Sequence, residues 1–197
     1  EKNINDLFGE QKADLYLTDP PYNVAYGNSK NPIWGKKWNG TKDGGVIKND
    51  SMENEEWILF CNKIYGSLKI STTNAPMYIC HAPGVDGAKL TLTFVDAGFH
   101  WSSTIILKKD RLVPGRSDYQ KMYESMLYGW IEGEKIKHLK DRKQTDVWEY
   151  TRPSINDLHP TMKPIEIMTK AFLHHNECKN IIDPFLGSGS TLIACEK

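Results

Sequence analysis

A short apolar run that ends in two consecutive prolines is the feature that most constrains this chain. Residues 13–18 read Ala-Asp-Leu-Tyr-Leu-Thr and predict a buried β-strand. Pro20 and Pro21 end the strand, because proline cannot donate a backbone hydrogen bond to a sheet. Asp19 and Tyr22 are therefore expected together at the carboxyl end of a strand, where open α/β sheets bind their ligands. An ordinary strand-ending turn would leave the same pattern, so this run alone does not identify a site.

The composition is that of a single globular domain. With 197 residues, the chain is long enough for one domain with a substantial core. Its 25 lysines and arginines balance 25 aspartates and glutamates, so the net charge gives no argument for a nucleic-acid partner. Cys61, Cys80 and Cys195 sit in apolar runs and are expected to be buried thiols, not disulfide partners or zinc ligands. We find no membrane-spanning apolar run and no signal peptide, which favours a cytoplasmic protein.

Apolar spacing predicts alternating strands and helices. A helix is expected over residues 54–68, because Trp57, Phe60, Cys61, Ile64 and Leu68 recur at helical spacing and form one buried stripe. Further strands are predicted at 77–80, 101–107, 123–131 and 180–182, and further helices up to about Ala97, after Pro164 and after Gly189. This order indicates an α/β fold with a parallel sheet and right-handed crossovers.

The helix after Pro164 has one apolar face and a histidine pair near its end. Its expected buried positions are Ile165, Met168, Thr169 and Phe172. His174 and His175 are expected where positive charge would complement the helix dipole. A metal site would need more ligands, and none is arranged for it in the sequence, so no metal site is expected.

Three polar segments carry basic side chains that suit a nucleic-acid surface. Segment 24–49 has five lysines, one acid, Trp34 and Trp38, and aromatic stacking beside ammonium groups fits nucleic acid. Segments 108–120 and 132–146 are predicted to be basic loops on either side of one strand. A solvated surface is the ordinary explanation for such charge, and a DNA-binding surface is the alternative.

A glycine turn follows the last predicted strand. Residues 183–190 read Asp-Pro-Phe-Leu-Gly-Ser-Gly-Ser, a strand–turn–helix pattern in which glycine lets the backbone approach a ligand. It is not a P-loop, because no lysine follows the last glycine, and it is a poor dinucleotide fingerprint. Upstream, residues 159–164 read His-Pro-Thr-Met-Lys-Pro.

Taken together, these stretches resemble the motifs of S-adenosylmethionine-dependent DNA amino-methyltransferases of the permuted, beta-ordered group. In that family the catalytic motif precedes the cofactor motif, as Asp19 precedes Gly187 here. Residues 123–130 resemble the strand that closes the sheet beyond the target pocket. Two positions depart from the commoner pattern, with Ser190 in place of Thr and Met162 in place of Gln.

The resemblance implies a Rossmann-like methyltransferase sheet with circularly permuted motif order, in one catalytic domain spanning residues 1–197. The family continues beyond the cofactor helix into a strand whose acid grips the ribose of the cofactor. This chain ends at Lys197, so we expect the last two of seven strands to be missing, the strand at 180–182 to form a sheet edge, and cofactor binding to be weak.

The resemblance also assigns roles to individual residues. The catalytic set is Asp19, Pro20, Pro21 and Tyr22, in which Asp19 and the Pro20 carbonyl accept the amino hydrogens of a flipped-out base and Tyr22 stacks on it. The cofactor-binding set is Asp183, Pro184, Phe185, Gly187, Ser188, Gly189, Ser190, Thr191, His159, Thr161 and Lys163. The DNA-binding set is Asn23, Lys36, Lys37, Lys108, Lys109, Arg111, Arg116, Arg142 and Lys143.

The implied activity is methyl transfer from S-adenosylmethionine to an exocyclic amino group in double-stranded DNA. Adenine N6 is favoured, because Asp leads the Pro-Pro-Tyr motif where cytosine enzymes more often have Ser; cytosine N4 is the alternative. RNA or protein glutamine as substrate, a non-catalytic DNA-binding remnant and a nicotinamide oxidoreductase are the competing interpretations. The family allows a homodimer, a cognate restriction endonuclease or an upstream ParB-like domain as partners, with a bacterial or phage origin.

Overall fold

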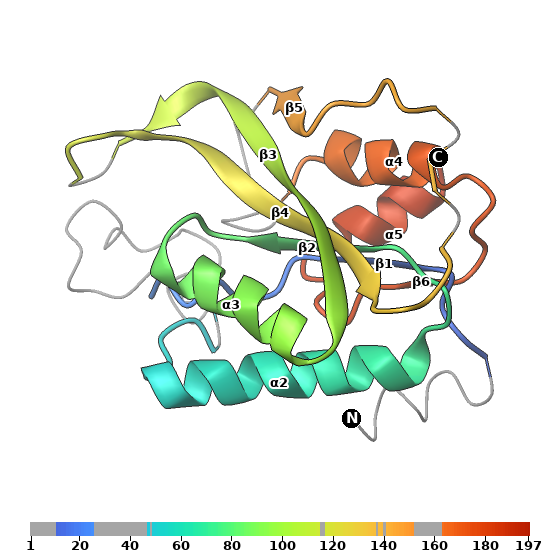
Figure 1. Ribbon diagram of the computed structural model, residues 1–197. Coiled ribbons are helices and arrows are strands. Elements are labelled where there is room, and N and C mark those ends of the chain that lie inside the picture. Colours follow the sequence, from blue (N-terminus) through green and yellow to red (C-terminus); the bar gives the residue numbers. More distant parts are fainter. Residues whose placement is uncertain are drawn as a thin grey trace.

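A six-stranded sheet between two layers of helices forms the body of the protein. The computed structural model describes residues 11–25, 47, 49–114, 117–136, 138–139, 141–151 and 163–197. The strands are β1 (Leu15–Thr18), β2 (Met77–His81), β3 (Phe99–Val113), β4 (Lys121–Ile131), β5 (Val147–Tyr150) and β6 (Ile181–Ile182), and the helices are α2 (Asn54–Ser71), α3 (Val85–Asp96), α4 (Ile165–His174) and α5 (Ser190–Cys195). Helices α2 and α3 cover one face of the sheet, and α4 and α5 cover the other (Figure 1).

The sheet is mixed, so the expectation of a parallel sheet was wrong for one strand. The strand order is β5-β3-β4-β2-β1-β6. Strand β1 is parallel to β2 and β6, and β5 is parallel to β3, whereas β4 is antiparallel to both β2 and β3. After a short connection β4 pairs back along β3 and separates it from β2, which a count of alternating elements does not reveal. Within the described residues, β6 forms one edge of the sheet, as predicted.

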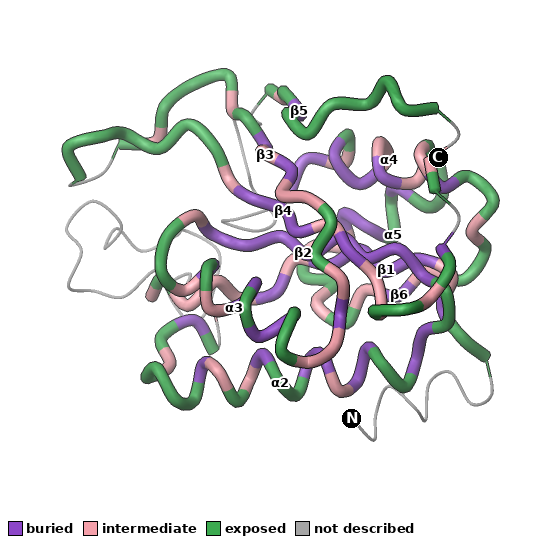
Figure 2. The backbone as a smooth tube through the Cα atoms, in the orientation of Figure 1, coloured by how far each residue is buried: buried purple, intermediate pink, exposed green. Residues whose placement is uncertain are grey.

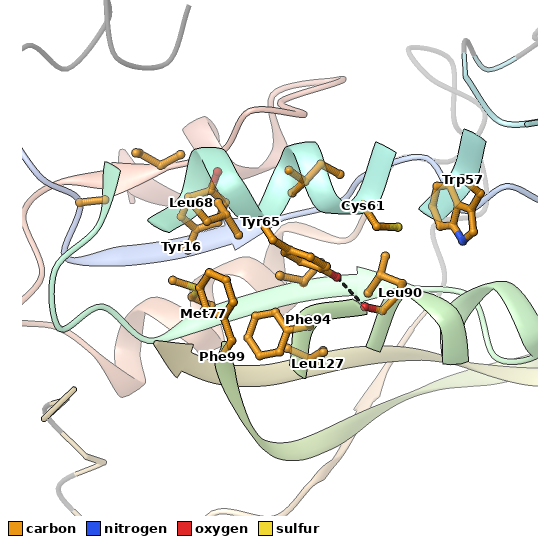
Figure 3. Close-up of a cluster of buried hydrophobic side chains, with 14 residues drawn as sticks. Tyr16, Trp57, Cys61, Tyr65, Leu68, Met77, Leu90, Phe94, Phe99 and Leu127 are labelled. Carbon is orange, nitrogen blue, oxygen red and sulfur yellow. Dashed lines mark hydrogen bonds between the residues drawn. The ribbon is translucent and has the colours of Figure 1, made fainter. Parts of the chain in front are cut away.

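The two central strands are the most deeply buried part of the chain. All residues of β1 and β2 are buried, and Figure 2 shows this buried backbone running through the middle of the molecule. Under α2 and α3, the Phe94 and Phe99 rings stack with centroids 4.6 Å apart, and the Tyr65 hydroxyl donates to the Leu90 carbonyl at 2.8 Å (Figure 3). The predicted α2 stripe is confirmed at Trp57, Cys61, Ile64 and Leu68, which are buried, whereas Phe60 is half-buried.

The buried face of α4 is shifted by one position along the sequence from the predicted face. Ile167, Met168 and Ala171 are buried, whereas Ile165, Thr169 and Phe172 of the predicted face are half-buried. The observed face has the same spacing (164, 167, 168 and 171) as the predicted face (165, 168, 169 and 172). An apolar pattern therefore fixes a helix face only to within about one residue.

For the histidines at the end of α4, burial disfavours the charged form that was expected to complement the helix dipole. The His175 Nε2 lies 2.9 Å from the Tyr78 hydroxyl in the core. Burial and His174 lower the pKa of His175 to about 4, and burial and Lys170 lower the pKa of His174. Packing against the sheet therefore outweighs the helix dipole at these positions.

The cysteines lie partly where they were predicted. Cys61 and Cys80 are buried, whereas Cys195 is exposed. It lies on the outer side of the six-residue helix α5, whose apolar sequence suggested burial. No helix in the described part of the chain combines the length and the apolarity that a membrane crossing requires.

Candidate active site

The turn after β1 is held rigidly by two side chains. Asp50 Oδ1 accepts the backbone amides of Tyr22 at 2.9 Å and Val24 at 3.3 Å. The Asn23 side chain bonds both backbone groups of Met52, donating at 3.1 Å and accepting at 2.6 Å, with Asn23 itself at φ 59°. Asn23 therefore has a structural role here, and its contact with DNA stays a prediction.

Four charged side chains and one phenol meet at this turn. The Tyr22 hydroxyl donates to Asp19 Oδ1 at 2.7 Å and lies 3.3 Å from Glu124 Oε2. Lys163 Nζ is 3.2 Å from Asp19 Oδ1 and 2.6 Å from Glu124 Oε2. Lys109 Nζ is 2.7 Å from Glu124 Oε1. We call the alternating series Lys109, Glu124, Lys163 and Asp19 the charge network.

The charge network keeps Glu124 and Lys163 ionised against the cost of burial, and at Asp19 it offsets only part of that cost. Burial acts to raise the pKa of Glu124, but Lys163 and Lys109 outweigh it and hold this pKa at about 2. Burial acts to lower the pKa of Lys163, but Asp19 and Glu124 raise it well above its usual range. For Asp19, burial is the larger effect and raises the pKa, while Lys163 and the Tyr22 hydroxyl oppose this rise.

Asp19 is nevertheless within reach of a ligand. Its side chain keeps 21% of its exposure, compared with 7% for Lys163. Lys163 Nζ lies 4.7 Å from the centroid of the Tyr22 ring and covers one of its faces. A planar ligand cannot stack on the face of Tyr22 that Lys163 covers.

The glycine turn after β6 is fastened to β1 through Asp183. This carboxylate accepts from the Thr18 hydroxyl at 2.7 Å, the Thr191 hydroxyl at 2.6 Å and the Phe185 amide at 3.0 Å. Burial raises the pKa of Asp183, and these donors oppose the rise. Asp183 thus fixes the turn, and its direct contact with a cofactor stays a prediction.

The same turn offers an open backbone surface. Gly187 and Gly189 have φ values of 53° and 83°, in the left-handed region. Beyond Gly189 itself and its two chain neighbours, no described residue lies within 4 Å of the position that a Cβ would occupy at Gly189. The Ser190 hydroxyl donates to the Lys163 carbonyl at 3.0 Å, so Lys163 joins this turn to the charge network.

The predicted site residues are only partly brought together. His159, Thr161, Lys36, Lys37 and Arg116 lie outside the described residues. Lys163, predicted to bind the cofactor, places its ammonium group 3.2 Å from Asp19 Oδ1.

The basic loop predicted at 108–120 begins later than expected. Lys108, Lys109 and Arg111 lie on β3, which continues to Val113. Residues 108–113 bury little apolar surface, so their strand depends on backbone pairing that side-chain patterns do not record. Lys108 pairs with Glu149 at 2.7 Å, while Lys109 belongs to the charge network.

The second basic segment lies far from the turn. Gln144 Oε1 is 3.1 Å from Nε2 of His174, the last residue of α4, whereas Lys163 precedes the first. Exposed Arg142 and Lys143 are therefore near the opposite end of α4 from the charge network. Their contact with DNA stays a prediction.

Sequence reasoning missed Glu124 as a site residue. The available signal was a lone acid at the start of the apolar run from Ser125 to Leu127 in β4. Among the described residues, no three His, Cys, Asp or Glu side chains cluster in an arrangement that could hold a metal ion.

Comparison with known proteins finds one recurring family. A family model described as DNA methylase matches residues 13–197. The "Putative methylase YubD" of Escherichia coli (strain K12) is 27% identical over 191 residues, which cover 95% of this chain and 73% of that protein. The crystal structure of M1.HpyAVI in complex with SAM superimposes with a TM-score of 0.63 at 22% identity, covering 99% of this chain and 84% of that one. The cytosine-N4-specific PvuII DNA methyltransferase gives a TM-score of 0.64 at 13% identity, covering 98% and 75%.

Proposed function

Because the chain belongs to the DNA methylase family, we propose that it transfers a methyl group from S-adenosylmethionine to the exocyclic amino group of a flipped-out DNA base, with adenine N6 the favoured target. The observation that carries the proposal is the 2.7 Å bond from Thr18 to Asp183. It joins the ends of adjacent parallel strands, so that the Asp19 motif and the glycine turn, far apart in sequence, lie side by side. A methyl donor and its acceptor must meet in this way.

The glycine turn suits a bound nucleoside cofactor. Its open surface at Gly189 and left-handed backbone allow close approach, and Phe185 lies beside it, packed on Phe60 with ring centroids 5.9 Å apart. S-adenosylmethionine bound there would supply the methyl group from its sulfonium centre. The residues that would hold it are the 183–191 segment and the backbone around Lys163.

Asp19 supplies the chemistry on the acceptor side. An exocyclic amino nitrogen is a weak nucleophile, because its lone pair is delocalised into the ring. Asp19 and the Pro20 carbonyl would each accept one amino hydrogen and localise the lone pair on nitrogen. Transfer forms a nitrogen–carbon bond, breaks a sulfur–carbon bond and leaves a protonated amine. Asp19 is placed to take the surplus proton, and Tyr22 would stack on the base with the face that Lys163 does not cover.

DNA is proposed to lie against the extended ends of β3 and β4. Strands β3 and β4 continue past the carboxyl end of β2, where His81 pairs with Ser125 (Figure 1). The extension consists of the residues of β3 after Leu107 and the residues of β4 up to Glu124. This extension lies on the same side as Asp19 and carries exposed Arg111 and Lys121. A two-stranded ribbon with cationic side chains fits a DNA groove.

Product analysis tests the activity and the target base. Protein is incubated with radiolabelled S-adenosylmethionine and unmethylated genomic DNA. The DNA is digested to nucleosides, which are separated by chromatography and identified by mass spectrometry. We expect N6-methyladenine, and N4-methylcytosine would move the target to cytosine. Asp19→Ala should lower the rate at least about 100-fold while the circular dichroism spectrum stays unchanged. A protein that binds both cofactor and duplex DNA yet methylates neither base would be a non-catalytic remnant.

A further inference from the structure

One carboxylate of the charge network has no part in the transfer chemistry described above, namely that of Glu124. Its Oε1 faces Lys109 at 2.7 Å and its Oε2 faces Lys163 at 2.6 Å. The residues that follow it, 125–127, are buried in the sheet and hold its backbone in place. A carboxylate engaged at both oxygens by ammonium groups is fixed, so Glu124 exerts a defined electrostatic effect on its neighbours.

Lys163 is shared unequally between two carboxylates. Its Nζ is 2.6 Å from Glu124 but 3.2 Å from Asp19. The stronger contact is therefore with Glu124, although Asp19 is the residue whose oxygens must receive the amino group of the base. An Asp19 carboxylate in full contact with an ammonium group would be a weaker and less accessible hydrogen-bond acceptor.

We propose that Glu124 is a positioning residue for methyl transfer, which draws the Lys163 ammonium away from Asp19 and keeps that carboxylate available to the target amino group. Lys109 completes the arrangement by fixing Glu124 Oε1, so that Oε2 faces Lys163. The role of Glu124 rests on the proposed methyl transfer and names a further residue that serves it.

The surrounding charges set the direction of the expected effect. The groups that face Asp19 are Lys163, Glu124, the Tyr22 hydroxyl, the Cys80 thiol on β2 and Asp183 after β6. Removing the negative charge of Glu124 leaves Lys163 with Asp19 as its carboxylate partner. The pKa of Asp19 then falls, because its ionised form loses a repulsive neighbour and gains a closer cation.

The test compares Glu124→Gln with Glu149→Gln. Glu149 also pairs with a lysine at 2.7 Å, Lys108 on the same β3 strand, but its side chain is 70% exposed. With DNA and cofactor saturating, we expect Glu124→Gln to lower kcat on the order of 10- to 100-fold, with the acid limb of the pH–rate profile displaced to lower pH. Glu149→Gln should change neither. Glu124→Asp keeps the charge, so its acid limb should stay near that of the wild type while kcat is intermediate.

A second readout does not require turnover. Carboxyl-carbon NMR titration of Asp19 in the cofactor-free protein should give a lower pKa in Glu124→Gln than in the wild type. An unchanged kcat, or a lower kcat with an unmoved acid limb and an unmoved Asp19 titration, would overturn the positioning role. Failure of the wild type itself to methylate DNA would instead overturn the proposed function, and thermal denaturation separates either result from misfolding.

Discussion

At the scale of single residues, ionisation decides what each buried side chain can do. Tyr22 lies against Asp19 and Glu124, and burial and these two carboxylates raise its pKa well above the usual range. The phenol therefore stays protonated and can act only as a donor to Asp19 near neutral pH. The Asp-Pro-Pro-Tyr run thus contains its own internal hydrogen bond, which the substitution Tyr22→Phe would remove while keeping the ring.

His175 makes the stability of the fold depend on pH. Its pKa is about 4 in the folded protein and 6.5 in an unfolded chain, so the unfolded state binds more protons between these values. The contribution of neutral His175 to the free energy of unfolding is fully present above about pH 6.5. About 3 kcal/mol of it is lost as the pH falls toward 4. In His175→Gln, we expect denaturant unfolding measured from pH 7 to 4 to show a shallower loss of stability.

The matched control for this titration is His138→Gln, which removes an exposed histidine. It should keep the pH dependence of the wild type. An equal loss of stability in wild type and His175→Gln would mean that Tyr78 and its surroundings do not hold His175 neutral in solution.

Glu124 shows why the contact between Asp19 and Tyr22 could be predicted but its setting could not. Asp19 and Tyr22 are three residues apart, so their proximity is local and visible in the sequence. Glu124 and Lys163 are 39 residues apart and meet Asp19 only through strand order and the approach to α4. A single glutamate in a strand has no periodic signal, so only the tertiary structure identifies its partners.

At the scale of elements, burial determines what the sequence can predict. The α2 stripe and strands β1 and β2 were found because each buries apolar side chains at a regular spacing. Strand β5 was missed, since only Trp148 among its four residues is buried and four residues give too short an alternation. The end of β3 was missed because backbone pairing alone defines it.

The three hydrogen bonds to Asp183 link β1 to the glycine turn and α5, and their contribution to stability can be measured. Thr18 is fully buried, and its hydroxyl is one of three donors to a carboxylate that burial has already made harder to ionise. Thr18→Val keeps the shape but removes this donor. We expect the free energy of unfolding to fall by about 1.5–3 kcal/mol, measured by denaturant titration.

The same substitution should weaken cofactor binding measured by calorimetry, because it loosens the glycine turn that the cofactor is proposed to occupy. Exposed Thr151→Val serves as the control and should leave both quantities unchanged. Stability and binding equal to those of the wild type in Thr18→Val would show that Thr191 and the Phe185 amide hold the turn without it.

At the scale of the whole molecule, the family and the fold class were predicted correctly from motif order. Asp19, Lys163 and Gly187 are far apart in sequence, yet β1, the approach to α4 and the turn after β6 bring their segments together. The family model matches residues 13–197, as the combined motifs indicated. The position of the two basic segments was less predictable, because charge alone does not say at which end of a sheet a loop will emerge.

Two pairs of basic side chains lie in different parts of the molecule, and DNA binding should depend on only one of them. Arg111 and Lys121 lie on the β3–β4 extension beside the charge network, whereas Arg142 and Lys143 lie near the far end of α4. If DNA must present a base to Asp19, the extension is the nearer surface. Neutralising two phosphate contacts should lower affinity for all sequences alike and reduce the slope of log K against log salt by about 2.

Arg111→Gln/Lys121→Gln should therefore bind duplex DNA more weakly with a flatter salt dependence, measured by fluorescence anisotropy between about 50 and 200 mM salt. Arg142→Gln/Lys143→Gln removes the same two charges and should bind as the wild type does, which makes it the matched control. The reverse result would place the duplex along the α4 side of the protein. A base would then have to reach Asp19 across the length of that helix, and the extension would lose its proposed role.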